Sequence, residues 1–276
     1  MSTAQILLLG AIAGFTIYLG LPLGRYTSTS VALRASLTAV ATGILVFLFW
    51  DVMTNGLKPV DPKLESHQWG WFALYASLLG AGFVAGLMTL VYYDEWMKRK
   101  RQADPAGTAA GDGHHVPLTW VESLSPGRRL ALLIATGIGL HNFGEGLAIG
   151  QSAASGQISL AIVLIIGFGL HNATEGFGIV GPMAAEPERP SWRFLGLMGL
   201  IGGGPTFVGT LVGQAWVSPA LATLFFGAAA GSILYVVIQL FEVCRRYTRP
   251  QLVAWALIAG IVLGFGTDFV LTAAGV

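Results

Sequence analysis

The feature that most constrains this chain is a series of long apolar stretches that follow one another almost without a break. A helix that crosses a membrane needs roughly 20 mostly apolar residues. Eight stretches of this kind cover residues of about 4–22, 32–52, 70–93, 129–152, 158–183, 194–215, 219–242 and 251–273. The pattern predicts an all-α polytopic membrane protein with eight transmembrane helices, in which residues 1–276 form a single transmembrane domain.

The small share of charged residues supports this fold class. Only 11% of the residues are charged, against about 25% in soluble domains, which is too few to cover a water-facing surface. The net charge of +1 gives no basic surface for nucleic acid, and the single Cys244 excludes an intrachain disulfide and a CxxC metal motif. No basic residue precedes Arg25, which favours a first membrane helix over a cleaved signal peptide.

The distribution of Lys and Arg predicts how the helices cross the bilayer. Cytoplasmic loops carry the excess of these residues. With the N-terminus outside, 13 of the 15 basic residues fall on the cytoplasmic side, and only Lys58 and Lys63 fall outside. We therefore expect a cell (inner) membrane protein with both termini outside the cytoplasm. Residues 94–128 are expected to form a flexible cytoplasmic loop, in which His114 and His115 are a solvated pair.

Two of the expected spans carry the same polar motif. The fourth contains His141-Asn142-Phe143-Gly144-Glu145-Gly146, and the fifth contains His171-Asn172-Ala173-Thr174-Glu175-Gly176. An ionisable side chain at the centre of a membrane helix costs about 2.5–3.5 kcal/mol, so a repeated pair of imidazole and carboxylate indicates a function. Residues i and i+4 share a helix face, and the His and Glu of each motif therefore point the same way.

The connection between these two spans, near residues 153–157, is short. The spans must then be antiparallel neighbours whose motifs face each other at one depth. Imidazole suits zinc, copper, iron and nickel, whereas carboxylate and carbonyl oxygens suit harder ions. A mixed set of nitrogen and oxygen ligands fits a cation that binds and also leaves, whereas a four-thiolate cage would hold zinc too tightly. We expect the two motifs to bind a divalent transition-metal ion, with zinc as the first choice and cadmium, iron or manganese as further candidates. The expected ligands are His141, Asn142, Glu145, His171, Asn172 and Glu175.

Two other functions are compatible with these side chains. Interhelical hydrogen bonds from His and Asn stabilise membrane bundles by about 1 kcal/mol each, so a purely structural role is one alternative, although carboxylates are poorly suited to it. An intramembrane zinc-dependent hydrolase also binds zinc through His and Glu, but the sequence has no HExxH motif and no serine elbow. A nucleotide-binding P-loop is absent as well. A transporter with the metal as its substrate, and not an enzyme, is the favoured interpretation.

The paired His-Asn-x-x-Glu-Gly motif resembles the ZIP (zinc/iron permease-like) family of metal transporters. The flanks agree, because Glu-Gly-Leu-Ala follows the first motif, Gly-Leu-His-Asn opens the second, and the seventh span contains the run from Gly227 to Val237. The resemblance covers essentially the entire chain. It implies eight spans in a three-plus-two-plus-three arrangement, with the first three spans related to the last three by an inverted repeat. It also implies metal binding by both motifs and a homodimer.

Departures from the family pattern suggest a divergent branch. Gly144 and Thr174 stand where the family commonly has Pro before the motif Glu. Gly204 stands where the family often has a Glu that helps to hold a second metal, so that ligand is missing. The run from Gly202 to Pro205 predicts an interrupted helix, which is a common device at transporter sites.

Three further polar residues complete the predicted metal-binding set. Asp51, at the outer end of the second span, either attracts and binds cations or is an ordinary acid at a helix end. Gln239, followed by Leu240, stands where the family frequently has a His-Glu pair, and it offers a neutral ligand. Glu242 shares the face of Gln239 and is placed to substitute for the missing acid nearer the cytoplasm.

Overall fold

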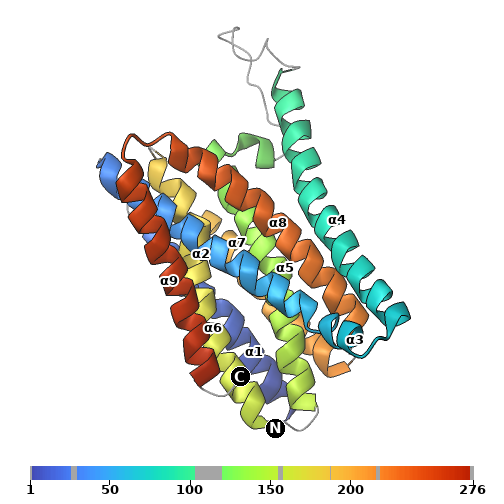
Figure 1. Cartoon of the computed structure of the whole chain (residues 1–276). Coiled ribbons are helices and arrows are strands. Elements are labelled where there is room, and N and C mark those ends of the chain that lie inside the picture. Colours follow the sequence, from blue (N-terminus) through green and yellow to red (C-terminus); the bar gives the residue numbers. More distant parts are fainter. Residues whose placement is uncertain are drawn as a thin grey trace.

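The structure is a computed structural model, and it describes residues 2–25, 30–102, 120–154, 158–186, 188–215 and 218–273. Within these ranges all regular structure is helical, as predicted (Figure 1). The long helices are α1 (Thr3–Phe15), α2 (Val31–Leu57), α4 (Trp69–Gln102), α5 (Pro126–Ala154), α6 (Ile158–Val180), α7 (Trp192–Ala215), α8 (Pro219–Arg245) and α9 (Pro250–Ala273). The short elements are η1 (Thr16–Leu19), η2 (Leu21–Arg25), α3 (Asp61–Glu65), η4 (Trp120–Ser123) and η5 (Gly181–Ala185).

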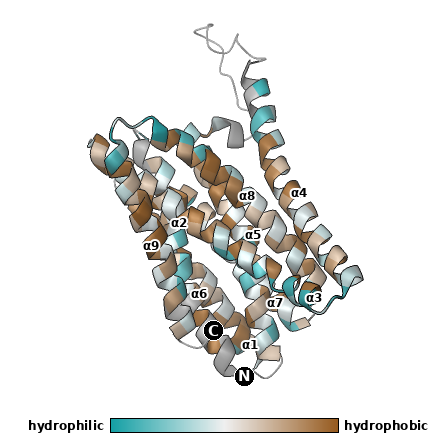
Figure 2. Ribbon diagram, in the orientation of Figure 1, coloured by the Kyte–Doolittle hydropathy of each residue, from teal (hydrophilic) through white to brown (hydrophobic). Residues whose placement is uncertain are grey.

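Seven of the helical segments in these ranges are long and apolar enough to cross a membrane. They correspond to the first four and the last three predicted spans, with α1, η1 and η2 counted as one segment. The fifth predicted span, α6, is a helix of 23 residues but is not among the seven. Large apolar side chains are exposed on the bundle, such as Trp255 at 72%, and Figure 2 shows apolar residues along α8 and α9. Because water would disfavour such a surface, the chain is a multi-pass membrane protein.

Glycines bring the backbones of neighbouring helices into contact. The closest helix pairs are α4 with α8, α2 with α9, and α5 with α7. A Cβ atom at Gly231 of α8 would overlap the carbonyl oxygen of Phe83 on α4, and one at Gly260 of α9 would overlap that of Val40 on α2. Small residues allow membrane helices to approach closely. We call the contacts of α4 with α8, of α2 with α9 and of α5 with α7 the glycine seams. They fix the positions of the helices that surround the two polar motifs.

The third predicted span is longer than the sequence pattern indicated. Residues 94–102, which were expected to open a flexible loop, continue α4 as helix. Lys and Arg are good helix formers, and Arg99 pairs with Glu95 one turn earlier at 3.2 Å, so the helix persists beyond its apolar part. The other end of the expected loop contains η4, and α5 begins at Pro126. Residues 103–119, with His114 and His115, lie outside the described residues.

One expectation about helix continuity was wrong. Helix α7 is unbroken through Pro205, although the Gly-Gly-Gly-Pro run predicted an interruption. Pro205 lacks the N–H that would bond to the carbonyl of Ile201, four residues earlier, and membrane helices tolerate such a loss when neighbouring groups compensate. The next carbonyl, that of Gly202, accepts a hydrogen bond from Asn142. The first predicted span is one membrane-length segment, Thr3–Arg25. Within it the α-helix α1 ends at Phe15, and the chain continues as the 3₁₀ segments η1 and η2.

Candidate metal centre

The two repeated motifs face each other inside the bundle, as predicted. All six His, Asn and Glu side chains of the motifs are buried, with exposed fractions between 0 and 4%. The Nε2 atom of His141 lies 3.2 Å from Oε1 of Glu145 and 4.0 Å from Oε1 of Glu175. The Nε2 atom of His171 lies 3.5 Å from Oε1 of Glu175, and the two imidazole centroids are 6.0 Å apart. We call these six side chains the His/Glu cluster.

The distances within the cluster suit a small cation. A tetrahedral ion with bonds of about 2.0–2.2 Å holds neighbouring ligand atoms about 3.4 Å apart. The pair formed by His141 and Glu145 and the pair formed by His171 and Glu175 already stand close to this separation, at 3.2 and 3.5 Å. The i, i+4 spacing of each motif on a continuous helix produces this arrangement.

Helix α2 adds a third acid to the cluster. A carboxylate oxygen of Asp51, a ring nitrogen of His141 and a ring nitrogen of His171 all lie within 4.8 Å of one another. Asp51 is half-buried, and its Oδ1 accepts a hydrogen bond of 3.2 Å from Nδ2 of Asn55 one turn later. The structure therefore brings Asp51 to the motif side chains, well inside α2 and not at its end.

Several polar atoms of the cluster have no hydrogen-bond partner among the described residues. They are Nδ1 and Nε2 of His141, Oδ1 of Asn142, Oε2 of Glu145, Nε2 of His171, Oδ1 of Asn172 and Oε1 of Glu175. A buried polar atom without a partner costs about 1–3 kcal/mol. A cation would satisfy the oxygen atoms and the unprotonated nitrogen atoms together, whereas a purely structural network would pair them with one another.

The two asparagine amides are anchored through their nitrogen atoms. Nδ2 of Asn142 donates to Oε2 of Glu175 and to the carbonyl of Gly202, both at 3.0 Å. Nδ2 of Asn172 donates to the carbonyl of Ala13, also at 3.0 Å. Because the amino group of each amide is used in this way, the carbonyl oxygen is left free, and that is the atom that can bind a metal.

Gln239 and Glu242 do not join the cluster. They line a separate cavity of about 400 Å³ near the C-terminal end of α8, together with Asp94, Tyr235 and Arg246. Buried apolar side chains form a layer that lies, along α5 and α6, between the cluster residues and the residues that line this cavity. Its members are Ile138 of α5, Ile179 of α6 and Ile233 of α8, which are at most 1% exposed. We call these three side chains the apolar layer.

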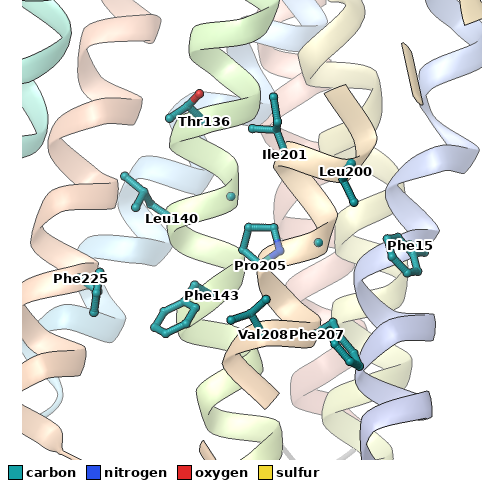
Figure 3. Close-up of a pocket in the computed structure, with 12 residues that line it drawn as sticks. Phe15, Thr136, Leu140, Phe143, Leu200, Ile201, Pro205, Phe207, Val208 and Phe225 are labelled. Carbon is teal, nitrogen blue, oxygen red and sulfur yellow. The ribbon is translucent and has the colours of Figure 1, made fainter. Parts of the chain in front are cut away.

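A larger cavity of about 630 Å³ beside α7 is apolar. Figure 3 shows Pro205 and Val208 of α7 facing Leu140 and Phe143 of α5 in this cavity. Gly204 also lines it, and a Cβ atom added there would meet only Leu200 within 4 Å. The position at which the family pattern often has an acid therefore borders the apolar cavity in this structure.

One polar contact of the cluster was not anticipated from the sequence. Oγ1 of Thr267, on α9, lies 3.3 Å from Nδ1 of His171. The sequence signal is a pair of adjacent polar residues, Thr267 and Asp268, within a largely apolar span. Because α9 lies almost one hundred residues along the chain from the motif, its contact with the motif depends on the tertiary fold.

Comparison with known proteins gives one family and two similar proteins. The model of the family described as "ZIP Zinc transporter" matches residues 97–271, a range that includes both motifs. A "Zinc transporter ZupT" of Chlorobium phaeovibrioides is 38% identical over 138 residues, which are 49% of this chain and 52% of that protein. A "Zinc transporter ZupT" of Chlorobium chlorochromatii is 35% identical over 138 residues, with shares of 49% and 51%. The chain spans about half the length of these relatives.

Proposed function

Because this chain belongs to the ZIP zinc transporter family, we propose that it carries divalent transition-metal ions, zinc first, through the His/Glu cluster towards the cytoplasm. The family consists of transporters and not of enzymes. The single observation that carries the proposal is the buried meeting of two imidazoles and two carboxylates at ligand separations. The proposed ligands are the six motif side chains, with Asp51 as a seventh group on the outer side.

We propose eight membrane helices, with α6 as the eighth and with an inverted repeat relating the first three spans to the last three. Equivalent contacts on the two sides of the cluster support this repeat. Asn142 of α5 donates to a carbonyl of α7, and Asn172 of α6 donates to a carbonyl of α1. Gly14 of α1 and Gly203 of α7 meet reciprocally, since a Cβ on either would overlap the carbonyl oxygen of the other. A contact of this kind is expected on a pseudo-two-fold axis.

The repeat also relates α2 to α8. Each helix has 27 residues and begins after a serine that caps it, Ser30 or Ser218. Counted from these caps, Gly43 corresponds to Gly231, and both lie in glycine seams. On the same count, Asp51 beside the cluster corresponds to Gln239 in the cavity on the other side. This correspondence supports Asp51 and Gln239 as the outer and inner groups on one path.

The proposed path runs past Asp51 to the cluster and leaves past Gln239 and Glu242. The apolar layer closes the inner half of this path, so transport requires it to open. Inverted repeats commonly give alternating access by movement of one group of helices against another. The glycine seam joins α5 to α7, so movement of α5 and α6 without α7 is unfavourable. Because α1 contacts α7 through Gly14 and Gly203, we infer that α1 and α7 move together with α5 and α6. The electrical driving force on a divalent ion is about 4.6 kcal/mol at about 100 mV.

The remaining parts of the proposal concern topology and assembly. We place both termini outside the cytoplasm in a cell (inner) membrane, because the Lys and Arg excess then lies inside. In Figure 1, α1 begins and α9 ends at the same end of the bundle, and α4 extends beyond it at the opposite end, in agreement with this orientation. We also propose a homodimer and a single transporter domain for the whole chain.

Metal uptake by the purified protein in liposomes tests the function directly. A dye inside the liposomes would report entry of zinc, cadmium, iron and manganese. The variants Glu145→Gln and Glu175→Gln remove one charge each from the cluster and are expected to reduce zinc uptake at least tenfold. Glu65→Gln on exposed α3 is the matched control and should leave uptake unchanged. Uptake that both cluster variants leave at the wild-type rate would contradict the proposal.

A further inference from the structure

Thr267 of α9 contacts Nδ1 of His171, whereas the other nitrogen of the same ring lies beside Glu175. Its Oγ1 lies 3.3 Å from Nδ1 of His171, while Nε2 of the same ring lies 3.5 Å from Oε1 of Glu175. The Thr267 hydroxyl also donates to the carbonyl of Gly264 at 2.7 Å. Thr267 therefore links the backbone of α9 to the outer side of the His/Glu cluster.

The direction of these two hydrogen bonds follows from the number of protons. A threonine hydroxyl has one proton to donate and two lone pairs. The 2.7 Å bond to the Gly264 carbonyl uses that proton, because a carbonyl only accepts. Towards His171 the hydroxyl oxygen must then accept, and the donor must be N–H at Nδ1. A neutral imidazole has one N–H, so Nε2 keeps its lone pair.

Aromatic packing holds the ring in the orientation that these bonds require. The Phe47 ring of α2 meets His171 edge-on, with centroids 5.9 Å apart and an interplanar angle of 65°. Gly264 makes room for Phe47, because a Cβ there would overlap the Phe47 ring. The carbonyl of Gly264 thus accepts the hydrogen bond from Thr267, and the missing side chain of Gly264 makes space for the Phe47 ring that packs on His171. The Nδ1 atom of His141, in contrast, has no partner among the described residues.

We propose that Thr267 is a positioning residue that fixes His171 as the Nδ1–H tautomer and thereby presents the Nε2 lone pair to the transported cation. The proposal rests on the proposed function, since it assigns the ligand atom of the same site. Imidazole ligands of metals generally donate their second N–H to a fixed acceptor, and removal of that acceptor typically lowers metal affinity 10–100-fold. Nothing in the two motifs themselves supplies this acceptor to His171.

Isosteric and conservative variants test the effect on metal binding. Thr267→Val keeps the shape but loses the acceptor, and it is expected to raise the Kd for zinc of the purified protein 10–100-fold. Thr267→Ser keeps a hydroxyl and should restore a Kd near that of wild type. Thr136→Val is the matched control, because among the described residues the Thr136 hydroxyl bonds only within α5, to the carbonyl of Leu132. A Thr267→Val protein with wild-type affinity would overturn the proposal.

A double-mutant comparison separates positioning from general stability. If Thr267 acts through His171, then Thr267→Val has no further effect on zinc affinity in a His171→Ala background. An equal loss of affinity in both backgrounds would assign Thr267 a purely structural role and overturn the proposal.

Imidazole ¹⁵N resonances of the metal-free protein test the tautomer without reference to transport. The His171 signal, assigned by its loss in His171→Ala, should show protonated Nδ1 in wild type and a tautomer mixture in Thr267→Val. Protonated Nε2 in wild type would overturn the inference, even if zinc is transported. Conversely, a wild-type protein that neither binds nor carries zinc would refute the proposed function, while the resonances would still decide the tautomer.

Discussion

Glu175 makes more contacts within the cluster than Glu145, although the two acids occupy the same place in their motifs. Oε1 of Glu175 lies 4.0 Å from Nε2 of His141 and 3.5 Å from that of His171, and Oε2 accepts from Asn142. Among the described residues, Glu145 has one such neighbour, Nε2 of His141 at 3.2 Å. A repeat that is symmetric in sequence therefore gives two chemically unequal carboxylates.

This inequality leads to a prediction for zinc affinity. Glu175→Gln removes a charge that faces both imidazoles, and we expect it to weaken zinc binding roughly 100-fold, which corresponds to the upper range of about 1.5–3 kcal/mol for a hydrogen bond to a charged group. Glu145→Gln should weaken binding only about tenfold, the lower range. Isothermal titration of the purified variants measures both values. Equal losses, or a larger loss for Glu145→Gln, would show that the asymmetry does not matter for the bound ion.

Protons should compete with the metal at the same side chains. Imidazole and carboxylate bind a metal only when the ligating atom is deprotonated, so metal affinity falls as the pH falls. We expect zinc uptake into liposomes to decrease steadily from about pH 7.5 to about pH 5.5, at a fixed membrane potential. Uptake of a cation through an unrelated ionophore in the same liposomes controls for the dye. A flat profile over this range would argue against His and Glu as the ligands.

How far the site follows from the sequence depends on which helices contribute to it. The contacts of His141 with Glu145 and of His171 with Glu175 follow from i, i+4 spacing on a helix, and they were predictable. The hydrogen bonds of Asn142 to Gly202 and of Asn172 to Ala13 join distant segments, and no local pattern specifies them. The same holds for Asp51 and Thr267, whose positions depend on how α2 and α9 pack.

At the scale of the elements, the spans were predictable from apolar length, but their ends and irregularities were not. Membrane-like composition ends near residue 93, yet backbone hydrogen bonding continues α4 to Gln102. Conversely, α1 ends at Phe15 inside an apolar stretch, where Gly20 approaches the backbone of α6 at Ala173 and Phe177. Hydropathy describes the environment of a helix, whereas tertiary contacts decide where it begins, bends and ends.

Two glycines of α4 provide a matched test of the glycine seams. Gly86 faces α8, and a Cβ there would overlap the carbonyl oxygen of Ala228, whereas nothing lies within 4 Å of a Cβ at Gly80. We expect Gly86→Ala to destabilise the folded protein by about 1–3 kcal/mol through overpacking. Gly80→Ala should be neutral or stabilise by up to about 1 kcal/mol, because Ala favours helix. Thermal unfolding in detergent compares the two, and similar Tm values would contradict the close approach of α4 and α8.

At the scale of the whole molecule, the cluster and the cavity around Gln239 lie on opposite sides of the apolar layer. Asp51 reaches the cluster from one side, whereas Gln239 and Glu242 are separated from it. The orientation of the chain in the membrane decides which of these sides meets the cytoplasm. On the orientation that we propose from the excess of Lys and Arg, the cavity side faces the cytoplasm.

Cysteine labelling tests this orientation. Cys244 is the single cysteine and is buried, so Cys244→Ala provides a suitable background. Glu65→Cys, on exposed α3, should react with a membrane-impermeant maleimide in intact cells. Arg249→Cys, just before α9, should react only after the membrane is permeabilised. The reverse pattern would invert the proposed direction of the path.

The glycine seams have a mechanical consequence. Two backbones in direct contact have no side chains between them that can change rotamer, so a seam offers the joined helices one alignment and no graded series of alternatives. Helices α4 and α8 should then move together as one rigid unit, and so should α2 and α9. Any rearrangement that carries an ion across should then be concentrated at boundaries where side chains lie between the helices, such as the one where Phe47 of α2 and Thr267 of α9 enclose His171 of α6.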